Sequence, residues 1–127
     1  MSTLKTSNIQ DTSGSNNSTP EEINQGRAKA WVNFNGAGTL SVRDSYNVTS
    51  VTDNATGKYT INFTTSFPNA NYCPVMYNNG NVSFGDIVNF NNQYMGGMVL
   101  STSNLQVASY NSGYADSALF FVVVFGD

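Results

Sequence analysis

Alternation of apolar and polar side chains is the feature that most constrains how this chain can fold. In the clearest example, Tyr59, Ile61 and Phe63 are separated by single polar residues, so the three apolar side chains would share one face of a β-strand. Stretches rich in Asn, Asp and Gly, notably 35–38 and 53–57, separate such segments and favour hairpin turns. We therefore predict an all-β fold, an antiparallel β-sandwich with a jelly-roll-like arrangement. The predicted strands are 28–34, 39–43, 46–52, 58–66, 72–77, 82–90, 94–100, 104–110 and 118–125.

The N-terminal part of the chain departs from this pattern. Residues 1–18 are rich in Ser, Thr, Asn and Gly and have few sizeable apolar side chains, so they cannot bury enough surface to fold alone. We predict a flexible N-terminal attachment arm over 1–18 and a single β-sandwich domain over 19–127. Leu4 and Ile9 would attach the arm to a neighbouring protein. The alternative is a plain flexible terminus.

A short helix is predicted between the arm and the first strand. Thr19 and Glu22 have the spacing of a capping box, and Pro20 occupies the first helical position. Gly26 stands where such a helix would end. One or two helical turns are therefore expected before the β-domain begins.

The last predicted strand is apolar on both faces. One face can pack against the opposing sheet of a sandwich, but the other needs a neighbouring element or a second subunit. We predict a subunit interface there, with an internal central strand as the alternative. The interface residues that we predict are Leu119, Phe121, Val123 and Phe125.

Composition argues against two classes of partner. Charged residues make up 10% of the chain, against about 25% in an ordinary soluble domain. The net charge is -3 and the five Lys and Arg residues are scattered, so no basic stripe is available for nucleic acid. No apolar run approaches the roughly 20 residues of a membrane-spanning helix. We also see no secretory leader, so we expect synthesis in a cytoplasm.

The side chains that usually carry catalysis are sparse. Histidine is absent, which removes Ser-His and Cys-His pairs and the commonest metal ligand. The carboxylates form no distinctive motif, and no metal-binding motif is recognisable. We therefore predict no enzyme activity, no metal and no cofactor. The alternative for the metal is a calcium ion on Asp86, Asp116 and asparagine side chains. Cys73, the single cysteine, is predicted to be a small buried hydrophobic residue.

Three predicted loops combine tyrosine with amide side chains. Tyrosine offers a flat apolar ring with a hydroxyl, and asparagine offers both a donor and an acceptor, which suits recognition of a sugar or a protein. Alternatively, these residues only form turns or pack inward. The receptor-binding residues that we predict are Tyr77, Asn79, Asn81, Tyr94, Tyr110, Tyr114 and Asp116.

An ordered series of short motifs within residues 19–72 closely resembles a module of bacteriophage tail-fibre and related virion proteins, many from phages of cyanobacteria and other marine bacteria. Residues after 72 carry no such resemblance. The motifs are Arg27-Ala28-Lys29-Ala30-Trp31-Val32-Asn33-Phe34-Asn35-Gly36, Ser45-Tyr46-Asn47-Val48, Thr52-Asp53-Asn54, Thr56-Gly57, Tyr59-Thr60-Ile61-Asn62-Phe63 and Pro68-Asn69-Ala70-Asn71-Tyr72.

The resemblance implies a structural protein on the virion exterior that assembles as a homotrimer, because phage fibres are typically trimers. The expected role is that of a tail-fibre or fibre-tip module in host-surface recognition, with other virion proteins and a host-surface glycan or protein as partners. The alternative is a capsid decoration or head-fibre protein held to the shell by its arm. The resemblance identifies no functional residues in this chain.

Overall fold

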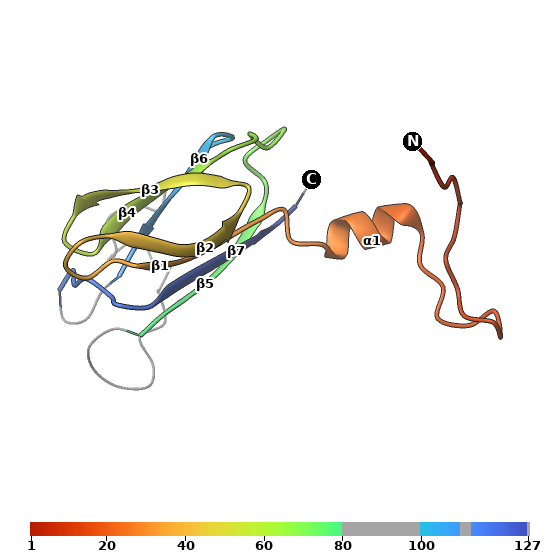
Figure 1. Cartoon of the computed structure of the whole chain (residues 1–127), viewed down its shortest axis with the longest axis horizontal. Helices are drawn as coiled ribbons and strands as arrows, with labels where there is room; N and C mark the ends of the chain where they lie inside the picture. Colours follow the sequence, from red (N-terminus) through yellow and green to blue (C-terminus); the bar gives the residue numbers. More distant parts are fainter. Residues whose placement is uncertain (80–99, 110–112, 127) are drawn as a thin grey trace.

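The chain folds into two packed antiparallel sheets, in a computed structural model that describes residues 1–79, 100–109 and 113–126 (Figure 1). One sheet has four strands in the order β2-β1-β7-β5, and the other has three in the order β3-β4-β6. The strands are β1 (Ala30–Asn35), β2 (Ser41–Tyr46), β3 (Val48–Ala55), β4 (Lys58–Phe63), β5 (Cys73–Asn78), β6 (Asn104–Ala108) and β7 (Phe120–Phe125). The prediction of an all-β antiparallel sandwich is confirmed. These strands do not establish the double Greek key of a jelly roll.

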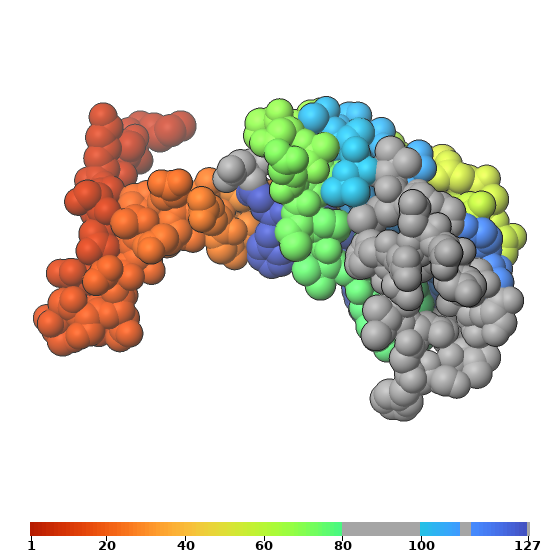
Figure 2. All heavy atoms as spheres, turned by 180° about the vertical axis from the view of Figure 1, so that it is seen from behind, coloured from red at the N-terminus to blue at the C-terminus, as the bar shows by residue number. Residues whose placement is uncertain are grey.

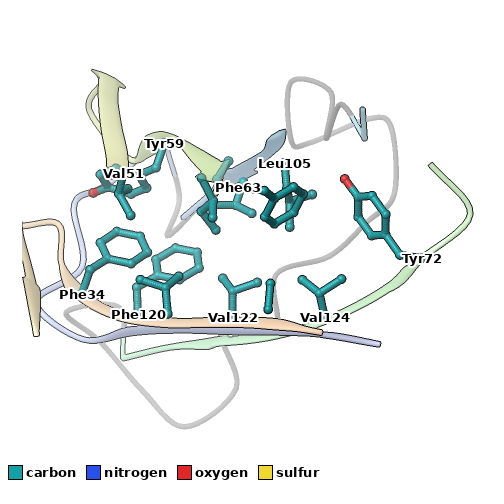
Figure 3. Close-up of a cluster of buried hydrophobic side chains, with 14 of the residues drawn as sticks. Phe34, Val51, Tyr59, Phe63, Tyr72, Leu105, Phe120, Val122 and Val124 are labelled. Carbon is teal, nitrogen blue, oxygen red and sulfur yellow. The ribbon is translucent and has the colours of Figure 1, made fainter. Parts of the chain in front are cut away.

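The core lies between the two sheets, as the alternating sequence predicts. Tyr59 and Ile61 of β4 point inward and are each 1% exposed, while the polar residues between them lie on the other face. Phe34 of β1 stacks on Phe120 of β7 with ring centroids 4.9 Å apart, and Tyr59 meets Phe34 edge-on at 5.1 Å. Figure 3 shows these side chains filling the space between the sheets. Aromatic pairs of this kind stabilise a core beyond their buried area.

Two hairpins have the predicted turn residues. After β1, the Asn35 side chain accepts a hydrogen bond from the Ala37 amide and donates one to the Ala37 carbonyl. In the second hairpin Ala55 already pairs with Lys58, so β3 and β4 are joined by a two-residue turn instead of the predicted five-residue loop. Gly57 in this turn has a φ of 65°, a conformation that favours glycine.

The helix α1 (Pro20–Gly26) has the predicted capping box. Thr19 Oγ1 accepts from the Glu22 amide, and a Glu22 carboxylate oxygen accepts from the Thr19 amide at 2.7 Å. No residue of α1 is buried. Figures 1 and 2 show the helix and the residues before it projecting from the sandwich.

The arm has local structure of its own. Ile9 and Ser18 exchange two backbone hydrogen bonds, and Asp11 Oδ1 accepts from the amides of Ser13 and Ser15. The Ser13 hydroxyl, which donates to the same oxygen at 2.7 Å, and the Ser15 amide hold the pKa of Asp11 below its usual value. Leu4 is 84% exposed and Ile9 is 52% exposed.

The structure corrects several details of the sequence analysis. The strands predicted at 28–34, 39–43 and 46–52 lie at Ala30–Asn35, Ser41–Tyr46 and Val48–Ala55, and the strand predicted at 58–66 ends at Phe63. Cys73 is exposed, because alternation along β5 places it on the outward side with Val75 and Tyr77. The last strand begins at Phe120, two residues later than predicted. The predicted strand 82–90 and all but the last residue of 94–100 lie outside the described residues.

Candidate functional site

The outward side of the four-stranded sheet carries a group of half-buried or exposed apolar side chains, beside the polar pair Asn33 and Asp44. We call it the outer face. Direct cross-strand pairing places Tyr46 beside Trp31, Trp31 beside Val123, and Val123 beside Val75, so one row of apolar side chains crosses all four strands. Tyr46 is 52% exposed and Val75 is 55% exposed. The residues of the outer face are Trp31, Tyr46, Val75, Tyr77, Phe121, Val123 and Phe125.

Three of the four predicted interface residues belong to this face. Phe121, Val123 and Phe125 point away from the core and are half-buried, whereas the alternate residues of β7 are almost wholly buried. Tyr77 of β5 stacks on Phe121 with ring centroids 6.5 Å apart. Leu119 precedes the strand, and its carbonyl accepts hydrogen bonds from the Asn79 amide and the Ser117 hydroxyl. Leu119 therefore helps to hold the start of β7 in place.

Asp116, one of the predicted receptor-binding residues, turns its carboxylate toward the domain. Its Oδ1 accepts from the Gly57 amide at 2.7 Å and lies 3.1 Å from the Tyr59 hydroxyl. Burial, and secondarily the hydrogen bond to Asp116, raise the pKa of Tyr59 well above its usual value. The carboxylate thus fastens the β3–β4 turn to the segment that precedes β7.

The other predicted receptor-binding residues do not gather in one place. Tyr77 lies on the outer face and is 60% exposed. Tyr114 is half-buried, with Lys58 Nζ 4.1 Å from its ring centroid. Asn79 is exposed, and its Oδ1 accepts from the Ser117 hydroxyl at 3.4 Å. The remaining three, Asn81, Tyr94 and Tyr110, lie outside the described residues.

A groove of mixed polar and apolar lining, which the sequence analysis missed, lies where β2 turns into β3. We call it the corner groove. Its volume is about 440 Å³, and it is open to solvent. The residues that line it are Lys29, Tyr46, Asn47, Thr64, Thr65, Ser66, Phe67 and Pro68.

Asn47 builds this groove. Its φ of 52° turns the chain sharply between the two sheets, a conformation that asparagine tolerates better than most residues. Asn47 Oδ1 accepts from the Thr65 amide at 2.8 Å, and Nδ2 donates to the carbonyls of Lys29 and Thr65. One side chain thus joins the start of β1, the β2–β3 corner and the loop after β4. In the sequence, the only sign of this turn is an asparagine between two strands.

Two cations meet at Asn24 of α1, and one of them, Lys29, also lines the corner groove. Lys29 Nζ donates to Asn24 Oδ1 of α1 at 2.6 Å, and Arg27 Nη2 donates to the same oxygen at 3.3 Å. Both positive charges therefore converge on one neutral amide oxygen. Among the described residues, neither cation pairs with a carboxylate. An anion at this place would be stabilised by charge-assisted hydrogen bonds.

In the described part of the chain, no three acidic or cysteine side chains lie close enough together to hold a metal ion. No helix there has the length and apolar character to span a membrane. No protein-family model, curated protein or solved structure matches the chain significantly.

Proposed function

We propose that this chain is a non-enzymatic structural protein of a bacteriophage virion, a tail-fibre or fibre-tip-like module on the particle exterior that takes part in host-surface recognition. The family proposal rests on the motif series in residues 19–72. That segment contains α1 and β1 to β4, so the residues that resemble phage fibres include strands from both sheets of the sandwich.

The outer face is the observation that carries the structural role. Val75 and Tyr77 of β5 are each more than half exposed, and they adjoin the half-buried apolar residues of β7. Contiguous apolar surface of this kind marks association sites on soluble proteins. Further copies of the chain would cover the part of this face on β5 and β7 and leave Tyr46, on the edge strand β2, open. The apolar face supports association, and the resemblance to phage fibres supports three copies.

The area of the outer face is small for a protein–protein interface. Six residues at about 3.3 Å each and four strands about 4.8 Å apart give a flat area of roughly 300 Å². A stable interface buries roughly 800 Å² on each partner. The outer face alone is therefore smaller than a stable interface, even though projecting side chains make its accessible area larger than the flat area. The arm, with Leu4 and Ile9 exposed, supplies additional contact surface.

The arm also favours the second candidate, a capsid decoration or head-fibre protein. It projects from the sandwich (Figure 2), and no residue of α1 is buried against the domain. A segment that stands free in the single chain is suited to gripping another virion protein. In this alternative Leu4 and Ile9 contact the shell.

Gold-labelled antibody against the purified protein tests both candidates on intact phage particles. Label at the fibre tips supports the fibre module, and label spread over the shell supports the decoration protein. Particles that contain no copy of the protein, judged by the same antibody after disruption, would contradict both. Light scattering on the purified protein tests the assembly state. The expected mass is three times that of the 13.7 kDa chain.

A further inference from the structure

The chemistry of the corner groove favours one class of ligand. We propose that the groove is a subsite for a saccharide that carries a carboxylate, a uronic acid unit of an acidic polysaccharide. This inference rests on the proposed role in host-surface recognition and names what the protein would recognise. Lys29 binds the carboxylate, the Tyr46 ring supports the sugar ring, and the loop hydroxyls bind the sugar hydroxyls.

The charge of the site selects an anion. Lys29 lines the groove, and Arg27 reaches the same Asn24 oxygen that Lys29 contacts. Two of the chain's five basic residues therefore lie together in a protein whose net charge is -3. A ligand carboxylate can replace the neutral Asn24 oxygen as the acceptor of Lys29. Hydrogen bonds between ionised partners are about twice as strong as those between neutral partners.

The aromatic wall of the groove selects a ring-shaped ligand. Tyr46 is the last residue of β2, lines the groove and is 52% exposed. Its ring is therefore available to a ligand. A tyrosine ring packs against the C–H face of a sugar ring while its hydroxyl stays hydrated. A small inorganic anion gains nothing from this surface.

The loop after β4 provides hydroxyl groups that remain free. Thr65 and Ser66 are exposed, and their hydroxyls form no hydrogen bond within the described residues. The Thr64 hydroxyl, by contrast, accepts from Thr49 Oγ1 at 3.0 Å. A hydroxyl both donates and accepts, as the hydroxyl groups of a saccharide do.

The groove is already formed in the free protein. The Thr65 amide and carbonyl are both bonded to the Asn47 side chain, and the Thr64 amide donates to the Asn47 carbonyl. The backbone of the loop that carries the hydroxyls is thus held in place before a ligand arrives. Preorganisation of this kind lowers the entropic cost of binding.

The test is a titration of ¹⁵N-labelled protein, followed by amide chemical shifts, with three ligands at low salt: a trimer of galacturonic acid, a neutral trimer of galactose, and acetate. We expect saturable shifts at Lys29, Asn47 and Thr65 with the acidic trimer. The neutral trimer should bind about tenfold more weakly, because one charge-assisted contact is lost. Acetate, which offers the charge without the ring, should produce no saturable shifts.

Two variants and a control identify the contacts. Lys29→Met keeps the apolar stem and removes the charge, so the affinity for the acidic trimer should fall about tenfold. Lys5→Met removes the same charge from the arm, away from the groove, and should leave the affinity unchanged. Tyr46→Ala should weaken binding of both trimers. The amide spectrum of each variant also shows whether the fold is retained.

Equal binding of the acidic and neutral trimers, equal loss from Lys29→Met and Lys5→Met, or no saturable shifts with any ligand would each overturn the proposal. Saturable binding of acetate would reduce the groove to a simple anion site and overturn the saccharide assignment. These outcomes are independent of the antibody experiment. If the antibody labels particles but the protein binds no uronide, the saccharide subsite is wrong and the virion role stands. If the protein binds uronide but the antibody labels no particles, the subsite stands and the virion role is wrong.

Discussion

Gly57 shows how much depends on a single backbone position in this domain. Its amide donates to Asp116 Oδ1, and its carbonyl accepts from the Ser109 amide at 2.7 Å. The turn between β3 and β4 is thereby joined to two segments far along the chain. An added Cβ at Gly57 would lie 2.6 Å from the Ser109 carbonyl oxygen, closer than such atoms can approach.

Gly57→Ala should therefore destabilise the protein strongly. Gly38 is a matched control, because its φ of 67° is nearly the same but nothing lies within 4 Å of an added Cβ. Gly38→Ala should cost roughly 1 to 2 kcal/mol from the left-handed conformation alone. Gly57→Ala should cost about 1 to 3 kcal/mol more because of the clash. Urea denaturation measures both, and equal losses would show that the Gly57 contacts relax without cost.

A second prediction at this scale concerns pH and the Tyr59 hydroxyl. The pKa of Tyr59 is raised in the folded protein, above its ordinary value of 10.0, by burial and then by Asp116. As the pH rises past 10, the unfolded chain loses this proton while the folded protein keeps it. The unfolded state then binds fewer protons, so the free energy of unfolding falls with pH.

Tyr59→Phe has no proton to lose at this position, so its stability should fall less steeply above pH 10 than that of the wild-type protein. Denaturation at pH 9 and pH 11 compares the two slopes. Tyr72, whose pKa is also raised by burial, remains in both proteins and accounts for part of the residual slope. Parallel slopes would mean that Tyr59 ionises freely in the folded state.

At the scale of strands, β7 offers a direct comparison of its two faces. Val122 is 1% exposed and points into the core, whereas its neighbour Val123 is half-buried on the outer face. Val122→Asp should prevent folding, since an unpaired buried charge costs several kcal/mol. Val123→Asp should leave a folded monomer and abolish the trimer. Circular dichroism and light scattering distinguish these results, and a Val123→Asp protein that still forms trimers would place the interface elsewhere.

Local alternation was enough to predict the core faces of β1 and β4, because each has one wholly apolar side. The other side is polar in β4, and in β1 it has Trp31 followed by two asparagines. It was not enough for β5, where residues on both sides are apolar and Cys73 was assigned to the wrong one. Contacts such as that between Gly57 and Asp116 join residues 59 positions apart. Such contacts depend on which distant turns lie side by side in the fold, and a local sequence pattern cannot predict that.

The corner groove could not be predicted for the same reason. The loop after β4 and the start of β1 become its walls only after Asn47 has turned the chain between the sheets. Lys29 looked like one of several scattered cations in the sequence. Its proximity to Arg27 and the Asn24 oxygen became visible only with α1 in place.

At the scale of the whole molecule, the hydrogen bonds that we describe within the arm join residues of the arm to one another or to α1. The Ile9–Ser18 pairing and the Asp11 turn are of this kind. A protein that begins at Thr19 should therefore keep the melting temperature of the full chain. It should also lose incorporation into virions, because Leu4 and Ile9 are gone.

Incorporation of this truncated protein is measured by mixing it with particles that lack the protein, or by producing it during infection. Leu4→Ser with Ile9→Ser in the full-length chain is the finer variant, since it keeps the arm and removes only the two apolar side chains. Normal incorporation of both variants would show that the arm is a simple terminus.

The pairing of β1 with β7 bears on when the protein can fold during synthesis. Ala30 lies opposite Val124, so the four-stranded sheet cannot close until nearly the whole chain has left the ribosome. Synthesis proceeds at about 5 to 20 residues per second, and β1 therefore waits for several seconds with one edge unpaired. A chain released before Phe120 leaves both β1 and β5 without the strand between them. Unfinished copies consequently lack the complete four-stranded sheet, although the strands of the three-stranded sheet are already present.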